Sequence, residues 1–428
     1  MRRARTPTFT DLRRGVDVPD PVPFDVPDRA TAVADRARDR GLCPECFGRL
    51  FGRLGHGLSN PERAERLGGP GPAAAGDEAT CPICDGLFAR LDTWVDRSLR
   101  AAEGYEWHRF ACGSRWDPER LAREEMLWSE IGTEWGESAR SAFNRELGKR
   151  IERRTGAAGI PEGPEVVFLA DLPVGRVELT VLPLYLQGRY RKLDRTLPQT
   201  RWPCRRCRGR GCDTCGGTGK TYPDSVEEII AAPFLRASEA QGSRFHGMGR
   251  EDIDARMLGR GRPFVLELVR PRRRTLDLRS IVAELPDGPG ARVEVRNLAP
   301  AQASDVVRIK EAAPEKSYRV GVRGDVAVAK VNEALDLALS RAIAQRTPTR
   351  VAHRRADRVR TRRIVAARLV DASEGRFTLD VRTEAGTYVK EWVEGDGGRT
   401  EPNLAALVGA PLSVEFLDVM EIHDSEVD

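Results

Sequence analysis

The 428-residue sequence lacks any long apolar run: no segment approaches the ~18 consecutive apolar residues that a membrane-spanning helix requires. Its start, M-R-R-A-R, leads into polar and proline-rich sequence and not into the apolar core of a secretion signal. It also has neither a G-x-G-x-x-G loop nor a P-loop, which argues against a nucleotide-binding enzyme of either kind. We therefore expect a soluble, cytoplasmic protein with no membrane partner.

The sequence also lacks a large excess of positive charge, because 65 acidic residues nearly balance its 70 lysines and arginines. The net charge is only +5, so any nucleic-acid surface must come from local clusters of basic residues. The densest cluster is residues 350–363, R-V-A-H-R-R-A-D-R-V-R-T-R-R, which holds seven arginines against one aspartate. A solvated helix face is the usual explanation of such a run, but like charges at this density repel unless an anionic partner neutralises them.

Eight of the nine cysteines fall in C-x-x-C pairs, which in a reducing compartment favours metal ligation over disulfides. The first set of four is Cys43, Cys46, Cys81 and Cys84, and the second is Cys204, Cys207, Cys212 and Cys215. Four thiolates close a tetrahedral site, so each set predicts a structural zinc. For the second set, surface thiols in a flexible basic linker are the alternative. Cys112 remains as a small core residue.

The pattern of apolar residues predicts an α+β protein in three parts. Residues 1–28 are proline-rich and form a flexible tail, residues 29–222 an α/β accessory domain with the second cysteine set near its end, and residues 223–428 a mixed-sheet domain. Among the elements expected are one helix over 122–154, a strand over 176–186 and one helix over 326–345.

The segment 245–264, F-H-G-M-G-R-E-D-I-D-A-R-M-L-G-R-G-R-P-F, packs three carboxylates and four arginines between glycines. Gly247 and Gly249 permit an irregular loop from which Asp252 or Asp254 can project. A neighbouring arginine would keep such a carboxylate ionised at neutral pH, as a nucleophile or general base requires. A charged surface turn is the alternative explanation.

This segment resembles the catalytic motif of the archaeal and eukaryotic tRNA pseudouridine synthases that modify T-arm uridines at tRNA positions 54 and 55. The resemblance covers residues 203–400 most strongly and implies that Asp252 is the catalytic carboxylate, with Asp254 as the second candidate. K-S-Y-R-V, residues 316–320, resembles the second motif, whose tyrosine, here Tyr318, packs on the flipped uracil. A-G-T-Y-V-K-E, residues 385–391, resembles the third motif and implies that Lys390 pairs with the aspartate, with Arg250 as a second candidate for that role.

The same resemblance implies the fold and the partners. It predicts an N-terminal THUMP-type RNA-binding region with a bound zinc, followed by a pseudouridine synthase domain that needs no organic cofactor. The H-R-R-A-D stretch resembles a thumb loop that grips tRNA. The candidate substrate-binding residues are therefore Tyr318, Tyr388, Arg350, His353, Arg354, Arg355 and Arg358. Glu394 departs from the family pattern, because most relatives have a histidine there.

Several alternatives stay open at this point. The sequence does not decide between position 54, position 55 or both, between a nucleophile and a base for Asp252, or which tRNA elements the accessory domain contacts. It leaves the oligomeric state open, with a monomer as the default expectation. A non-catalytic, zinc-containing tRNA-binding or processing protein is the alternative function.

Overall fold

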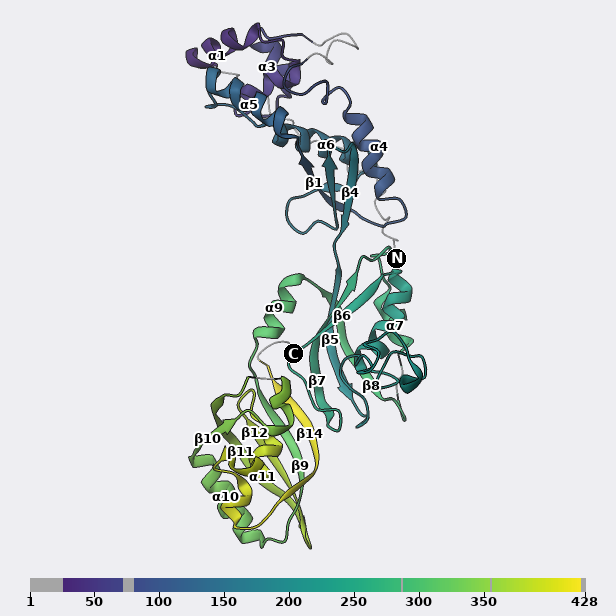
Figure 1. Cartoon of the computed structure of the whole chain (residues 1–428), viewed down its shortest axis with the longest axis vertical. Helices are drawn as coiled ribbons and strands as arrows, with labels where there is room; N and C mark the ends of the chain where they lie inside the picture. The colour runs from purple at the N-terminus through teal and green to yellow at the C-terminus, as the bar shows by residue number, and fades with distance from the viewer. Residues whose placement is uncertain (1–25, 72–80, 286–287, 355, 425–428) are drawn as a thin grey trace, which may run out of the picture. The chain divides into compact units, whose positions relative to one another are not determined.

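The computed structural model describes residues 26–71, 81–285, 288–354 and 356–424. The chain forms two compact units, Met1–Leu182 and Pro183–Asp428 (Figure 1). Most of the predicted tail lies outside the described residues, and the first helix already begins at Asp28. Among the described residues, no helix combines the length and apolar character that crossing a bilayer requires.

The first unit is a small sheet with helices packed on it. Its helices are α1 (Asp28–Arg38), α2 (Pro44–Gly48), η1 (Arg49–Phe51), α3 (Asn60–Arg66), α4 (Leu91–Ala101), α5 (Pro118–Ile131) and α6 (Ala139–Thr155). Its strands are β1 (Arg109–Arg115), β2 (Ala158–Gly159), β3 (Val166–Asp171) and β4 (Arg176–Val181). The sheet order is β2-β1-β3-β4, in which β1 runs parallel to β2 and β3, and β4 is antiparallel to β3. Helices α4 and α6 contact this sheet (Figure 1).

The single helix predicted over 122–154 is wrong, because the structure has two helices there. Helix α5 ends at Gly132, whose φ of 92° is a conformation that glycine adopts without strain. Helix α6 then starts afresh at Ser138, whose side chain accepts a 3.0 Å hydrogen bond from the backbone N–H of Ser141. The apolar spacing continues through the break, which is why the periodicity alone did not reveal it.

The second unit is built on one ten-stranded sheet. Its strands are β5 (Leu184–Lys192), β6 (Gly242–Gly247), β7 (Arg256–Val269), β8 (Val293–Ala301), β9 (Glu315–Arg323), β10 (Ala342–Arg346), β11 (Val359–Ser373), β12 (Arg376–Thr383), β13 (Thr400–Glu401) and β14 (Ser413–His423). Its helices are η3 (Asp213–Cys215), α7 (Val226–Ser238), α8 (Leu278–Ala283), α9 (Ala303–Glu311), α10 (Val328–Ser340), η4 (Thr349–Arg354), α11 (Val389–Glu394), η5 (Asp396–Gly398) and α12 (Leu404–Val408). The order is β13-β10-β11-β12-β9-β14-β7-β5-β8, with β6 paired to β7.

The sheet carries two hydrophobic cores that meet at strand β14. One core lies around β5, β7 and α7, and the other around β9, β12 and α10. Strand β14 joins them, because it is antiparallel to β9 along most of its length and parallel to β7 at Asp418 and Val419. Tyr318 packs against both cores and therefore marks the seam.

The division between the units differs from the boundary expected at residue 222. The predicted strand over 176–186 is two strands, and the second of them, β5, hydrogen-bonds between β7 and β8 in the large sheet. The chain from Pro183 onward therefore belongs to the second unit, including the second cysteine set. Likewise, the helix expected over 326–345 ends at Ser340, because residues 342–346 pair with β11 as strand β10.

Candidate active site and metal sites

The loop between β6 and β7, residues 248–255, carries the acidic cluster at the floor of a cleft of about 290 Å³. The cleft is lined by Trp202, Arg250, Glu251, Asp252, Ile253, Asp254, Arg350 and Lys390. Four segments that are distant in the sequence therefore meet here: the loop itself, the segment at Trp202, η4 and helix α11. Five of these residues are candidates that the sequence had indicated: Arg250, Asp252, Asp254, Arg350 and Lys390.

Asp252 faces two cations that come from different elements. Nη1 of Arg350 lies 3.1 Å from its Oδ1 and 3.0 Å from its Oδ2, and Nζ of Lys390 lies 3.7 Å from Oδ2. The side chain is about one-third exposed, at 32%, so a ligand in the cleft can reach it. The site therefore presents an accessible carboxylate whose negative charge is balanced by fixed positive charges.

Lys390 makes its shorter contact with Asp254, not with Asp252. Its Nζ lies 2.7 Å from Oδ2 of Asp254. Burial works against ionisation of Asp254, but this hydrogen bond and the charge of Lys390 lower its pKa below the ordinary value. One lysine thus bridges both candidate carboxylates, and contact with Lys390 does not by itself single out Asp252.

Arg350 is anchored from behind by Glu391, the residue after Lys390. Its Nε donates to Oε1 of Glu391 at 2.5 Å, and the carboxylate of Glu391 is nearly buried. Burial alone would lower the pKa of the guanidinium, but Glu391 and Asp252 raise it above its ordinary value. Arg350 is therefore a fixed cation that lies beside Asp252 and lines the cleft.

Tyr318 lies near the acidic loop but is not one of the cleft-lining residues. Burial, with a smaller contribution from the charge of Asp252, raises the pKa of its hydroxyl to about 12. The group is therefore neutral at physiological pH. Tyr318 lies on β9 at the seam of the two cores and lines a second cavity of about 400 Å³, together with Asp380 and His423.

The other residues predicted for the site lie on the acidic loop, before helix α11 and in the arginine-rich run. Arg250 lies over the ring of Trp202, with Cζ 5.3 Å from the ring centroid. Tyr388 precedes α11, and its backbone N–H and C=O bond to the side chain of Gln345 at 2.9 and 3.0 Å. His353 and Arg358 are exposed. The side chain of Arg354 is not described, and Arg355 lies outside the described residues.

Buried polar side chains hold the acidic loop in place, and sequence reasoning missed them. Lys192 donates from Nζ to the carbonyl oxygens of Leu197, Asp252 and Ile253 at 2.9, 3.1 and 2.7 Å. Three acceptors satisfy all three donors of the ammonium group. A single lysine at the end of a strand offers no sequence signal of this role, because its partners are backbone atoms, two of them in a distant loop.

Glu251 forms the second support of the loop. Its carboxylate accepts from Nε of Arg262 at 2.8 Å and from the hydroxyl of Tyr190 at 2.9 Å, and all three side chains are buried. Arg262 also donates to the carbonyl oxygen of Met248 at 2.6 Å. Glu251 and Arg262 both belong to the motif recognised in the sequence, but their pairing required the structure.

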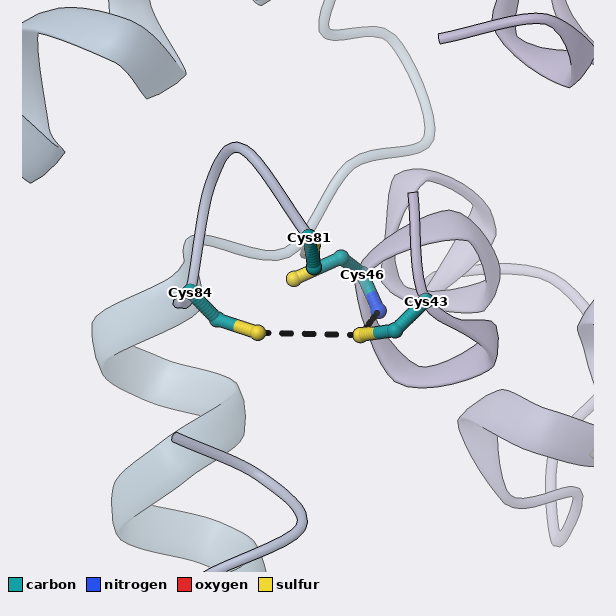
Figure 2. A group of neighbouring side chains, drawn as sticks. All are labelled: Cys43, Cys46, Cys81 and Cys84. Carbon is teal, nitrogen blue, oxygen red and sulfur yellow. Dashed lines mark hydrogen bonds between the residues drawn. The ribbon is translucent and has the colours of Figure 1, made fainter. Parts of the chain in front are cut away.

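The first cysteine set forms a buried cluster in the first unit (Figure 2). The four Sγ atoms lie within 4.8 Å of one another, and those of Cys43 and Cys84 are 3.7 Å apart. A disulfide would need about 2 Å, whereas thiolates at Zn–S distances of ~2.3 Å in a tetrahedron are about 3.8 Å apart. The donor set and spacing therefore fit a tetrahedral metal.

The second cysteine set has the same geometry within the second unit. The Sγ–Sγ distances are 4.0 Å for Cys204 and Cys212, 3.9 Å for Cys207 and Cys215, and 3.7 Å for Cys212 and Cys215. Backbone N–H groups of Gly211 and Gly219 point at Sγ of Cys207 and Cys215, each at 3.2 Å. Such donors stabilise thiolates, so this set also fits a metal, and the alternative of scattered surface thiols does not match the convergence.

Comparison with known proteins supports the family expected from the motifs. Residues 185–423 match the family model "Pus10, C-terminal", and residues 94–171 match "Pus10 THUMP domain, archaeal". The expected THUMP region is thereby confirmed, and it includes helix α4 and the sheet strands β1 and β3.

Individual relatives match over nearly the whole chain. A tRNA pseudouridine synthase Pus10 of Methanothrix thermoacetophila is 41% identical over 89% of this chain and 91% of its own length. One of Methanothermobacter marburgensis is 40% identical over 94% of this chain and 100% of its own. Among solved structures, a chain of a Cbf5-Nop10-Gar1 complex gives a TM-score of 0.31 at 15% identity, covering 47% of this chain and 46% of that one, which is too weak to bear on the assignment.

The two family models fall in the expected order, one in each structural unit, and the relatives span both units at about 40% identity. The chain belongs to the Pus10 family of tRNA pseudouridine synthases, which are isomerases.

Proposed function

We propose that this protein converts uridine to pseudouridine in the T-arm of tRNA, at position 54, position 55 or both, and that Asp252 is the catalytic carboxylate. The observation that carries the proposal is the accessible Asp252 carboxylate in the cleft, faced by Arg350 at 3.0 Å and Lys390 at 3.7 Å. An oriented carboxylate of this kind suits attack on a sugar carbon or removal of a sugar proton. The names of the relatives, all tRNA pseudouridine synthases, support tRNA as the substrate.

In the proposed reaction the target uridine leaves its stack and enters the cleft. Asp252 either attacks C1′ of the ribose or removes the proton from C2′, and by either route the N1–C1′ bond breaks with its electron pair passing to the uracil ring. The ring turns and C5 bonds to C1′. In the first route this bond displaces the Asp252 carboxylate from C1′, and in the second route Asp252 returns the proton to C2′. The proton on C5 is then lost and N1 gains a proton. Atoms and electrons balance without a redox or nucleotide cofactor.

The neighbours of Asp252 take positioning roles in this scheme. Arg350 and Lys390 orient the carboxylate and stabilise the negative charge that develops on the departing uracil. Tyr318, on the seam of the two cores, would contact the uracil once the base is inserted, and Tyr388, immediately before α11, would lie next to the base. The sequence motif assigns tRNA contacts to His353, Arg354, Arg355 and Arg358, and the exposure of His353 and Arg358 supports this.

The two cysteine sets would each hold a structural zinc. Four thiolates leave no coordination position open for water or substrate, so a bound zinc would supply folding free energy and no chemistry. We further propose that the first unit is the RNA-binding accessory part and that the second unit is catalytic. The protein would act in the cytoplasm, where its tRNA substrate would be found.

The test compares Asp252→Asn with the matched variant Asp254→Asn on an unmodified tRNA transcript. Pseudouridine is mapped by carbodiimide labelling, and tRNA transcripts with a single replacement at position 54 or 55 identify the site. We expect Asp252→Asn to abolish product while tRNA affinity changes by no more than a few fold, and Asp254→Asn to keep measurable activity. Product from Asp252→Asn near the wild-type level would reject this aspartate, and a wild-type protein that makes no product would favour the non-catalytic alternative.

A further inference from the structure

The second cysteine set lies on a short loop whose two ends pair with each other next to Trp202. Pro203 and Lys220 form an isolated β-bridge, and the backbone N–H of Thr221 donates to the carbonyl oxygen of Trp202 at 2.9 Å. The rings of Trp202 and Tyr222 meet edge to face, with centroids 5.7 Å apart at 85°. The loop that carries the four cysteines, residues 203–220, thus closes next to the backbone of Trp202, whose indole packs on Tyr222.

That indole also lines the cleft of Asp252. Among the described residues lining the cleft, Trp202 is the only aromatic one, because Tyr318 is not part of the lining. The guanidinium of Arg250 lies over the indole ring at 5.3 Å. The wall of the cleft next to Asp252 therefore combines a flat aromatic surface with a positive charge.

The loop has almost no apolar support other than its cysteines. Within residues 203–220 the buried positions are Cys204, Cys207 and Gly219, and the side chains of Arg205, Arg206 and Arg208 are exposed. The four thiolates lie where a core would otherwise be needed. A metal held by them would fix the loop, and through the paired ends of the loop it would fix Trp202.

We infer that Trp202 is a base-stacking residue for an unpaired nucleotide of the RNA substrate, and that the second cysteine set, when it holds a metal, keeps this indole in place. A nucleotide offers a π face and a phosphate, which match the indole and the guanidinium of Arg250. Stacking of one base on an aromatic residue is worth about 1–3 kcal/mol, which corresponds to roughly 5- to 150-fold in affinity. This inference rests on the proposed function, because the cleft must receive RNA.

The first experiment compares Trp202→Ala, Trp202→Phe and the wild type on the same tRNA transcript. We expect Trp202→Ala to lower kcat/KM by about 10-fold or more, Trp202→Phe to restore it to within a few fold, and metal content to stay unchanged in both. A Trp202→Ala variant within twofold of an active wild type would overturn the stacking role and leave the proposed function standing. An inactive wild type would instead reject the proposed function. The tRNA affinities of Trp202→Ala and the wild type would then still test the stacking role.

The second experiment tests the coupling between the metal and Trp202. The double variant Cys212→Ser, Cys215→Ser should lose one metal per chain and show the same loss of tRNA affinity as Trp202→Ala, and adding Trp202→Ala to it should cause little further loss. Cys112→Ser is the matched control, since Cys112 belongs to neither set, and it should keep both metals. If the affinity loss of the triple variant equals the product of the losses in the double cysteine variant and in Trp202→Ala, the two sites act independently. That result, or an unchanged affinity after metal loss, would show that the cysteine loop does not act through Trp202.

Discussion

Nη1 of Arg350 lies 3.0 Å from Oδ2 of Asp252, although 98 residues separate them in the sequence. Arg350 opens the arginine-rich run that resembles a tRNA-gripping loop, yet its own side chain turns to the acidic loop and to Glu391. The first arginine of a run of seven therefore belongs to the candidate active site.

Replacing Arg350 should reduce catalysis more than tRNA binding. Arg350→Ala removes a charged hydrogen bond to Asp252, worth about 1.5–3 kcal/mol, so we expect kcat to fall roughly 10- to 150-fold. Arg358→Ala is the matched control, because Arg358 is exposed on the same run. It should weaken tRNA binding, with a shallower salt dependence, and leave kcat nearly unchanged. The prediction fails if both variants show the same pattern under single-turnover kinetics.

The buried pair of Glu251 and Arg262 should be a large contributor to stability. Both side chains are essentially inaccessible, so Glu251→Gln leaves a buried guanidinium uncompensated at a cost of about 3–5 kcal/mol. The free energy of unfolding in urea measures this. Glu284→Gln breaks the exposed pair of Arg236 and Glu284 and should change stability by less than ~1 kcal/mol. Equal effects in the two variants would contradict the structural role of Glu251.

The support from Lys192 should give stability a specific pH dependence. Burial lowers the pKa of Lys192 from 10.5 to about 8 in the folded protein. Between these two values the unfolded chain binds more protons than the folded one, so this group makes stability rise as pH increases from 8 to 10.5. Below pH 8 the lysine is protonated in both states, and its contribution no longer varies.

The comparison with Lys192→Met isolates that contribution. The stability of the wild type relative to Lys192→Met should increase by up to about 3 kcal/mol across the interval from pH 8 to 10.5. A constant difference between the two proteins across this interval, measured by urea unfolding, would mean that the ammonium group is not destabilised by burial.

Removing the first cysteine set should unfold part of the first unit. Cys46 is fully buried and belongs to the hydrophobic core of that unit. We expect Cys46→Ser to lose one metal per chain, measured by mass spectrometry of the acid-released metal, and to lower the unfolding temperature of the first unit by several degrees or more. Cys112→Ser should keep its metal content; burial raises the pKa of that thiol to about 12, so it is a poor ligand. Retention of the metal by Cys46→Ser would exclude this cluster as the binding site.

Local sequence patterns predicted most helices and strands. They were least accurate where pairing with a distant strand decides the secondary structure of a segment. The sequence predicts strands over 165–172, 317–322, 376–382 and 412–420, and strands β3, β9, β12 and β14 lie close to these ranges. Strand β10 was expected as the end of a helix, since A-I-A-Q-R has no strong local preference and becomes a strand through pairing with β11. The break between α5 and α6 was missed because the apolar spacing continues across Gly132.

The sequence predicted the motif residues of the candidate site but not the contacts between them. The sequence indicated Asp252, Lys390 and Arg250 and both cysteine sets, because each lies in a recognisable short pattern. Trp202 and Lys192 were missed, since neither lies in a motif that points to the cleft. Only the fold brings them to the acidic loop.

The sequence by itself determined the family, the two sets of candidate metal-ligating thiols and the acidic loop with its flanking glycines, because each is encoded in short motifs such as C-x-x-C. The tertiary structure alone decided which cation meets which carboxylate, that β5 and the second cysteine set belong to the second unit, and that an indole forms a wall of the cleft. The physical reason is that these contacts join segments tens to hundreds of residues apart, and their geometry is fixed by strand pairing and burial, which no local pattern specifies.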